Sequence, residues 1–295
     1  MGTVSTVRET LYFEGVGLHT GARCKIALHP MEPRLSDDTD ASGERRVPPA
    51  SLHPLAVPCR ILIRKGKHTF PARWDYVVDT TRATVLGDGG VKISTVEHLM
   101  AALWMTGVTH CLIELVQGEE IPILDGSALP FVEAICPFPP ASLPDTPQGV
   151  VGDTLQLRYA DRYLALSLAG STVFGYIQFP EPLGVQAGAF PMANALAAIA
   201  PARTFGFLRE VEALRAQGLA LGGALENALV IDETGYYNPA RFEDEPLRHK
   251  LLDALGDLYL SGVCLRRFTL VAVKPGHALN VQLARLVAQR FGVEE

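Results

Sequence analysis

The sequence predicts an α+β protein of two domains, each built from a layered sheet and helices, with the active site at the domain interface. At 295 residues the chain is long enough for one large or two ordinary domains. Five prolines interrupt the segment 136–149, which indicates a linker between domains 1–138 and 150–295. Both halves combine short β-branched segments with few helical ones, as expected for α+β layers.

In the first domain, β-branched content and bounding turn residues predict strands, and apolar periodicity predicts helices. The strands are expected at 25–28, 56–64 and 111–116, and the helices at 94–104 and 130–135. The segment 30–54, rich in Asp, Ser, Pro and Arg, predicts a long exposed loop.

The second domain is predicted from the same signals. Its strands are expected at 155–159, 163–168, 173–179, 228–232 and 268–274, and its helices at 207–217, 246–260 and 277–291. The helix from residue 246 has the clearest start, because Asp244 and Glu245 place negative charge at the positive helix end and Pro246 suits the first turn.

The composition excludes several classes of protein. A net charge of −6 and a pI near 5.8 argue against general nucleic-acid binding. Five cysteines without a Cys-x2-Cys pair suggest neither a disulfide framework nor a thiolate zinc site. The N-terminus lacks the apolar core of a signal peptide, and no apolar run reaches the ~20 residues of a membrane span. We therefore expect a cytoplasmic protein, and a transient contact with a membrane surface stays open.

The helix 246–260 carries a stripe of three chemically capable side chains, His249, Asp253 and Asp257. Positions four apart are neighbours on a helix surface, so His249 and Asp253 can hold one metal ion. The opposite face is leucine-rich and predicts burial. The alternative is a surface His/Asp pair, but Gly256 on the same face would let another element approach closely.

Glu97 and His98 lie at the expected start of the helix 94–104. One interpretation is structural, because Ser94-x-x-Glu97 matches a capping box. The other is catalytic: His98 with His249 and Asp253 makes the two-imidazole, one-carboxylate set of a catalytic zinc site, and Glu97 would act as a base beside it. The same set serves ferrous iron, so Zn²⁺ and Fe²⁺ both remain candidates.

His277 lies in a turn where a strand ends and a helix begins. It is either an exposed turn residue or, if it faces the metal, a group that steadies an oxyanion or protonates a leaving amine. Asp257, one turn beyond the expected ligands, would then orient its imidazole.

Six segments in order along the chain resemble the UDP-3-O-acyl-N-acetylglucosamine deacetylase family, a group of zinc amidases that commit sugar to lipid A synthesis. They are Gly15-Val16-Gly17-Leu18-His19-Thr20-Gly21, Ser94-Thr95-Val96-Glu97-His98-Leu99, Ile121-Pro122-Ile123-Leu124-Asp125-Gly126-Ser127, Ala202-Arg203-Thr204-Phe205-Gly206-Phe207, the segment 241–253, and Gly276-His277-Ala278-Leu279-Asn280.

The resemblance assigns roles to matching residues. It implies that His98, His249 and Asp253 are zinc ligands, that Glu97 is the general base, and that His277, held by Asp257, assists the intermediate and amine departure. It also implies that Thr204 hydrogen-bonds the oxyanion and that Lys250 contacts the nucleotide sugar. Phe205 and Val211 would line an apolar passage for the acyl chain, and His19 would lie near the active site.

Two segments depart from the family pattern. The chain has Gln178-Phe179-Pro180-Glu181-Pro182 where the family commonly has Asp-Phe-x-His-Pro, and the loop 31–50 is longer and more polar than expected. We expect altered substrate binding rather than lost chemistry. The function expected is metal-dependent deacetylation of an acylated UDP-N-acetylglucosamine by a monomer. The alternatives are the same chemistry on another N-acyl sugar and a non-catalytic binding protein of the same fold.

Overall fold

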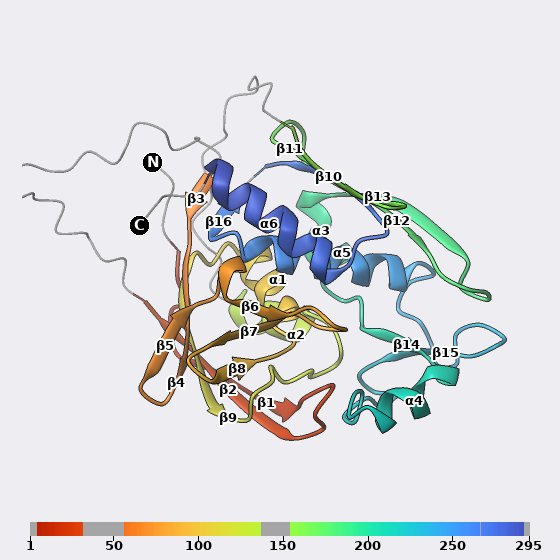
Figure 1. Cartoon of the computed structure of the whole chain (residues 1–295), viewed down its shortest axis with the longest axis horizontal. Coiled ribbons are helices and arrows are strands. Elements are labelled where there is room, and N and C mark those ends of the chain that lie inside the picture. Colours follow the sequence, from red (N-terminus) through yellow and green to blue (C-terminus); the bar gives the residue numbers. More distant parts are fainter. Residues whose placement is uncertain (1–4, 32–55, 137–153, 266, 292–295) are drawn as a thin grey trace, which may run out of the picture.

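Two five-stranded sheets enclose a central layer of helices (Figure 1). The computed structural model describes residues 5–31, 56–136, 154–265 and 267–291. One sheet comes from each half of the chain, and the helices between them come from both halves. The α+β prediction is confirmed. The predicted linker and the predicted loop 30–54 lie almost wholly outside the described residues, so the domain boundary stays a prediction.

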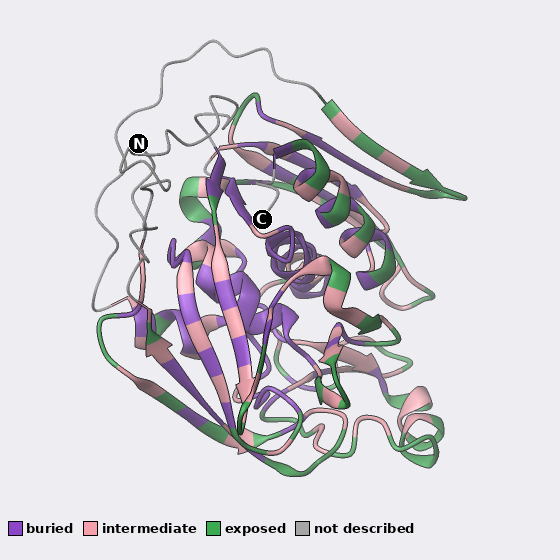
Figure 2. Ribbon diagram, turned by 60° about the vertical axis from the view of Figure 1, so that its left-hand side comes forward, coloured by how far each residue is buried: buried purple, intermediate pink, exposed green. Residues whose placement is uncertain are grey.

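The first sheet has the strand order β1-β2-β9-β4-β5, with β4 and β9 parallel and the other pairs antiparallel. Its strands are β1 (Leu11–Val16), β2 (Arg23–Pro30), β9 (His110–Gln117), β4 (Arg60–Lys65) and β5 (His68–Pro71). Buried and partly exposed residues alternate along β4 and β9, as Figure 2 shows. This period of two gives the sheet one apolar face, which packs toward the helices.

The second sheet has the order β10-β11-β17-β12-β13, with β12 and β17 parallel. Its strands are β10 (Thr154–Tyr159), β11 (Arg162–Ser167), β17 (Thr269–Val273), β12 (Thr172–Gln178) and β13 (Val185–Pro191). The strand β13 was not predicted, because its sequence alternates Ala and Gly rather than β-branched residues. Gly188 of β13 and Gly175 of the neighbouring strand β12 leave room for leucine side chains of the helix 245–259, which packs against this sheet.

Four helices form the central layer: α1 (Glu97–Met105), α2 (Leu129–Ile135), α5 (Glu245–Tyr259) and α6 (His277–Phe291). Every residue of α5 except Arg248 and Lys250 is buried, because α1, α6 and β12 pack around it. The leucine-rich face is buried as predicted, and so is the polar stripe, which Leu252 and Tyr259 were expected to shield from bulk solvent. Among the described residues, no helix combines the length and apolar character needed to cross a membrane.

The remaining elements are short. They are β3 (Ala56–Pro58), β6 (Val77–Asp79), β7 (Val85–Asp88), β8 (Val91–Ile93), β14 (Phe205–Phe207), β15 (Leu229–Ile231), β16 (Val263–Leu265), α3 (Ala195–Ala198), α4 (Val211–Ala216) and the 3₁₀ turns Trp74–Tyr76, Met192–Asn194 and Leu208–Glu210. The strands β3 and β16 pair across the two halves of the chain.

Three predicted elements differ in the structure. The strand predicted at 56–64 is two strands, β3 and β4, which belong to different sheets. The helix predicted at 207–217 is α4 preceded by a 3₁₀ turn, because Phe207 pairs as a strand with Ile231. The helix predicted from residue 94 begins at Glu97, because Thr95 has a φ of 59°.

The capping box predicted at Ser94 and Glu97 is wrong. The N-cap of α1 is Val96, without a side-chain cap hydrogen bond, and the Ser94 hydroxyl lies 3.5 Å from the Glu119 carbonyl oxygen. The Glu97 carboxylate instead accepts a hydrogen bond from the backbone N–H of Thr84. The structural explanation for Glu97 is therefore removed, and its carboxylate faces the interior.

Candidate metal centre and active site

The helices α1 and α5 pack closely because Gly256 has no side chain. A Cβ at Gly256 would overlap the backbone carbonyl oxygen of Glu97. The close approach predicted for Gly256 is thus made by the first turn of α1. It brings Glu97 and His98 from one half of the chain against the α5 stripe of the other half.

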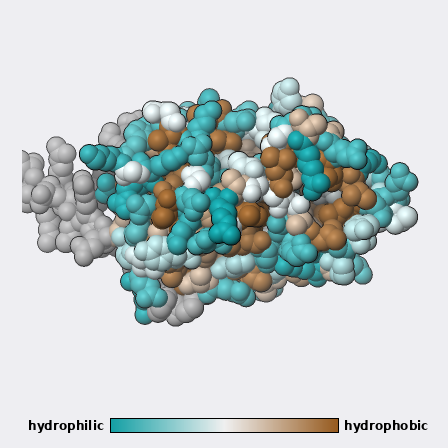
Figure 3. Space-filling model, turned by 90° about the horizontal axis from the view of Figure 1, so that it is seen from below, coloured by the Kyte–Doolittle hydropathy of each residue, from teal (hydrophilic) through white to brown (hydrophobic). Residues whose placement is uncertain are grey.

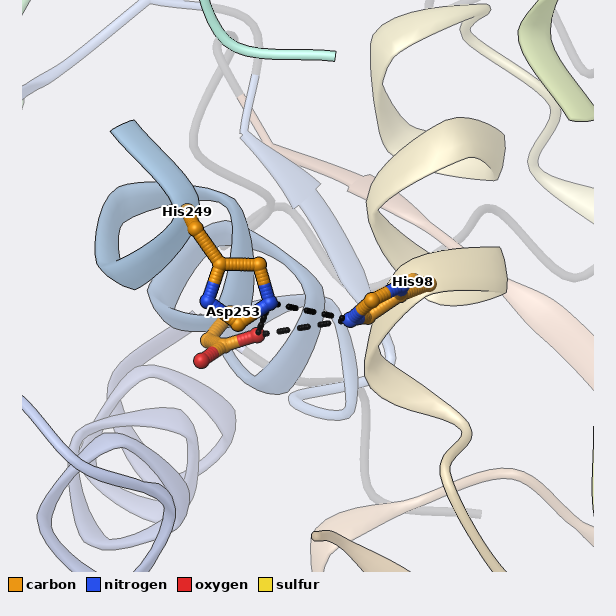
Figure 4. Close-up of side chains that lie close together, drawn as sticks. All are labelled: His98, His249 and Asp253. Carbon is orange, nitrogen blue, oxygen red and sulfur yellow. Dashed lines mark hydrogen bonds and ion pairs between the residues drawn. The ribbon is translucent and has the colours of Figure 1, made fainter. Parts of the chain in front are cut away.

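His98, His249 and Asp253 converge between α1 and α5 (Figure 4). The Nε2 atoms of the two imidazoles are 3.2 Å apart, and Asp253 Oδ1 lies 3.4 Å from His249 Nε2 and 3.8 Å from His98 Nε2. All three residues are at most 4% exposed. The three residues predicted as ligands are thus brought together, with one donor atom each facing a common point.

The donor set suits a divalent metal ion. In a tetrahedral site with bonds of about 2.0–2.1 Å, neighbouring ligand atoms are about 3.3 Å apart, close to the separations seen here. Asp253 Oδ1 is buried and has no hydrogen-bond partner among the described residues. A buried carboxylate oxygen without a donor is unfavourable unless a cation compensates it.

The protonation of the three groups also suits a cation. Burial lowers the pKa of His98 and lowers that of His249 further, so both imidazoles are neutral and can offer lone pairs. Burial alone would raise the pKa of Asp253, but its interaction with His249 and the positive charge of Lys250 outweigh it and hold that pKa below its usual range. Lys250 donates to Asp253 Oδ2 at 2.7 Å, so Oδ1 is the oxygen left for a ligand.

Glu97 of α1, Asp257 of α5 and His277 of α6 form a second buried cluster, which includes the α5 residue one turn beyond Asp253. His277 Nδ1 lies 2.9 Å from Asp257 Oδ2, and His277 Nε2 lies 3.9 Å from Glu97 Oε1. The hydrogen bond predicted between Asp257 and His277 is present, and the exposed-turn alternative for His277 is wrong, because its ring is buried.

Glu97 and His277 differ in the direction in which each can transfer a proton. Burial raises the pKa of Glu97 to about 8, and the neighbouring carboxylates add to the rise. Burial alone would lower the pKa of His277, but the charges of Asp257 and Glu97 outweigh it and raise that pKa to about 9. Near neutral pH His277 is therefore protonated, which suits a proton donor. The raised pKa makes the ionised carboxylate of Glu97 a stronger base than an ordinary glutamate.

The other residues predicted for the site lie around these clusters in different ways. Phe205 of β14 packs its ring edge-on against His249, with centroids 5.8 Å apart. Val211, at the start of α4, lines a separate pocket of about 640 Å³ between α4 and β15. Phe205 is not among the residues that line this pocket, so the two predicted passage residues face different spaces. Two backbone hydrogen bonds hold Thr204: its N–H donates to the Gly126 carbonyl oxygen, and its carbonyl oxygen accepts from the Leu229 N–H.

The loop that carries His19 is fixed from both halves of the chain. Its backbone N–H and that of Thr20 donate to the buried carboxylate of Glu120, and its carbonyl accepts from Leu221. Burial lowers the pKa of His19, with an opposing effect of Glu120 and a further lowering by His277. The position of His19 near the active site stays a prediction.

Sequence reasoning missed several residues that hold the site together. Thr84 and Asn280 both donate to Asp257, with distances of 2.5 and 3.0 Å. Arg203 and Glu245 form a buried ion pair at 2.9 Å at the start of α5. Glu245 and Asn280 lie in segments that carry the family resemblance. No sequence pattern around Thr84 indicated that it belongs to the site.

Comparison with known proteins agrees with this arrangement. The model of the family described as LpxC, UDP-3-O-acyl N-acetylglycosamine deacetylase, matches residues 4–289. A relative from Leptospira biflexa is 35% identical over 96% of this chain and 88% of its own length. Relatives from Syntrophotalea carbinolica and a Synechocystis species are 39% and 37% identical, over 96% and 97% of this chain and 87% and 99% of their own lengths. All three are named UDP-3-O-acyl-N-acetylglucosamine deacetylase. The family resemblance drawn from the six segments is confirmed, and the chain belongs to the LpxC family of UDP-3-O-acyl-N-acetylglucosamine deacetylases.

Proposed function

We propose that this chain hydrolyses the acetamide of a UDP-3-O-acyl-N-acetylglucosamine, releasing acetate and UDP-3-O-acyl-glucosamine, the committed step of lipid A biosynthesis. Family membership supports the reaction. The observation that carries it is the pair of buried clusters on α5, one suited to a metal ion and the other to proton transfer. A non-catalytic binding protein would need no buried base and acid beside a metal site.

In this proposal His98, His249 and Asp253 hold the metal, which is Zn²⁺, with Fe²⁺ as the alternative that the same ligands serve. A metal ion held there supplies Lewis acidity toward the acetamide carbonyl and the attacking water. Lys250 neutralises the second oxygen of Asp253 and, from its partly exposed position, contacts the nucleotide sugar.

Glu97 and His277 divide the proton transfers. Glu97 Oε2 accepts from the Thr84 N–H, so Oε1 is the oxygen that takes a proton from the attacking water. Water adds to the carbonyl carbon, and the amide C–N bond then breaks. His277 donates a proton from Nε2 to the departing amine nitrogen, because its Nδ1 is committed to Asp257. Thr204 is assigned the hydrogen bond to the oxyanion from the family resemblance alone.

The acyl chain is assigned to the apolar surface beside β14 and α4. Apolar side chains gather toward the right of the molecule when it is seen from below, the side on which α4 lies (Figure 3). Leu208, in the 3₁₀ turn just before α4, is an exposed apolar side chain. A transient membrane contact, a cytoplasmic location and a monomeric state stay predictions from the sequence.

A second candidate is the same chemistry on a different N-acyl sugar. It is favoured by the departing segment 178–182, because the ring of Phe179 packs edge-on against Phe205, with centroids 5.3 Å apart. Phe205 in turn contacts His249, so the altered segment adjoins the site through one aromatic ring.

The test is acetate release by purified protein from three substrates: UDP-3-O-acyl-N-acetylglucosamine, UDP-N-acetylglucosamine, and an acylated N-acetylglucosamine without the nucleotide. We expect rapid release from the first only, with His249→Ala as the background control. Equal rates on all three would support the second candidate, and no release from any would refute both.

A further inference from the structure

Thr84 lies between the two halves of the active site and contacts both of its acid–base carboxylates. It is fully buried, just before β7, in a segment without a recognisable motif. Its backbone N–H donates to Glu97 Oε2 at 3.1 Å, and its hydroxyl donates to Asp257 Oδ1 at 2.5 Å. One residue therefore holds the base, which comes from α1, and the carboxylate that orients the acid, which comes from α5.

A third hydrogen bond fixes Thr84 against the start of α1. Its carbonyl oxygen accepts from the N–H of Val96, the N-cap of that helix, at 3.4 Å. The residue is thus tied by its backbone to the turn that carries Glu97, and only its hydroxyl reaches across to α5. Removing the hydroxyl alone would break the link between the halves without disturbing the backbone contacts.

The hydroxyl completes the set of donors around Asp257. Oδ1 accepts from Thr84, and Oδ2 accepts from Asn280 Nδ2 and from His277 Nδ1. A buried carboxylate held by three donors cannot turn about its side-chain bonds without breaking a hydrogen bond. Its orientation in turn directs His277 Nε2 toward Glu97 Oε1, 3.9 Å away.

We infer that Thr84 is a positioning residue for the deacetylation, whose hydroxyl and N–H together set the separation between the proton-accepting oxygen of Glu97 and the proton-donating nitrogen of His277. The inference rests on the proposed function. Both proton transfers depend on this separation, since the substrate amide must reach both groups. The hydrogen bonds of Thr84 go to Glu97, Asp257 and Val96 and to none of the three candidate metal ligands, so we expect its contribution to appear in turnover rather than in metal or substrate binding.

The test uses Thr84→Val, which keeps the shape and the N–H but lacks the hydroxyl, and Thr84→Ser, which keeps both donors. We expect Thr84→Val to lower kcat by about 10–100-fold, with KM and bound metal unchanged, as for other residues that orient a reacting group. Thr84→Ser should keep most of the wild-type kcat. The matched control is Thr106→Val, another buried threonine, whose hydroxyl bonds the Ala102 carbonyl at the far end of α1; its kcat should equal that of the wild type.

Circular dichroism establishes that each variant is folded, and Thr84→Ser carries the test if Thr84→Val is not. A folded Thr84→Val enzyme with the wild-type kcat would overturn the inference, while the wild-type activity would still support the proposed function. A Thr84→Ser enzyme as impaired as Thr84→Val would also overturn it, because the methyl group and not the hydroxyl would then matter. A wild-type protein without deacetylase activity would refute the proposed function and this inference with it.

Discussion

The two buried clusters each include one aspartate of α5, Asp253 or Asp257, one helical turn apart, and they differ in how their polar atoms are satisfied. In the first, Asp253 Oδ1 has no hydrogen-bond partner among the described residues, and it faces two neutral imidazoles. In the second, both oxygens of Asp257 accept hydrogen bonds, from Thr84, Asn280 and His277. An incomplete set of donors favours a cation, whereas a complete one fixes a proton donor. The same helix and the same burial thus support two different functions.

The largest effect is expected from Asp253→Ala, which removes a ligand of the first cluster and leaves Lys250 without its partner. A metal supplies several kcal/mol of transition-state stabilisation, so turnover should fall by on the order of a thousandfold or more. Metal content by elemental analysis should fall with it. Asp88→Ala, at an exposed carboxylate of β7, should change neither. Full activity in Asp253→Ala would remove the first cluster from the mechanism.

Glu97→Gln should separate the clusters, because it changes the base and leaves the three ligands. We expect kcat to fall by about 10²–10⁴-fold, the usual contribution of a general base, with metal content unchanged. Steady-state kinetics and metal analysis of the same preparation measure both. If kcat were retained, another group would have to accept the proton from water.

Asp257→Asn should move the pH profile rather than abolish the reaction. In the proposed mechanism the protonated form of His277 is the active one, so activity should be present below its pKa of about 9 and be lost as the pH rises through it. Removing the negative charge of Asp257 lowers this pKa, and the alkaline fall in kcat should shift down by about one to three pH units. An unchanged alkaline limb would show that His277 does not supply the proton.

Gly256→Ala should have the smallest chemical effect and act on the packing between α1 and α5. A Cβ there overlaps the Glu97 carbonyl oxygen, and the forced separation of the helices should cost about 1–3 kcal/mol of unfolding free energy. Urea denaturation measures it. Gly206→Ala, where a Cβ meets nothing within 4 Å, should leave the stability unchanged.

The sequence predicted the parts of the site that depend on local spacing. His249, Asp253 and Asp257 follow from a four-residue period on one helix, and Glu97 and His98 stood at the start of another. The central strands of both sheets were predicted from β-branched content and bounding turn residues. These signals are local, and the structure places each of them within a few residues of the expected position.

The parts that were missed depend on tertiary contacts. Thr84 joins the site only because its segment crosses the start of α1, and no spacing along the chain encodes that. Ser94 matched a capping box, but the left-handed backbone of Thr95 takes Ser94 out of the helix. The strand β13 has small residues where β-branched ones would be expected, and one of them, Gly188, lies against Leu247 of α5.

The separation of the two clusters is tested most directly by the metal content of two variants at adjacent positions, His98→Ala and Glu97→Ala. These side chains leave α1 side by side, yet His98 faces Asp253 and Glu97 faces His277. Elemental analysis after dialysis should find that Glu97→Ala retains a stoichiometric metal ion and that His98→Ala loses it. Loss of the metal from both variants, or its retention in His98→Ala, would contradict the assignment of one cluster to the metal and the other to proton transfer.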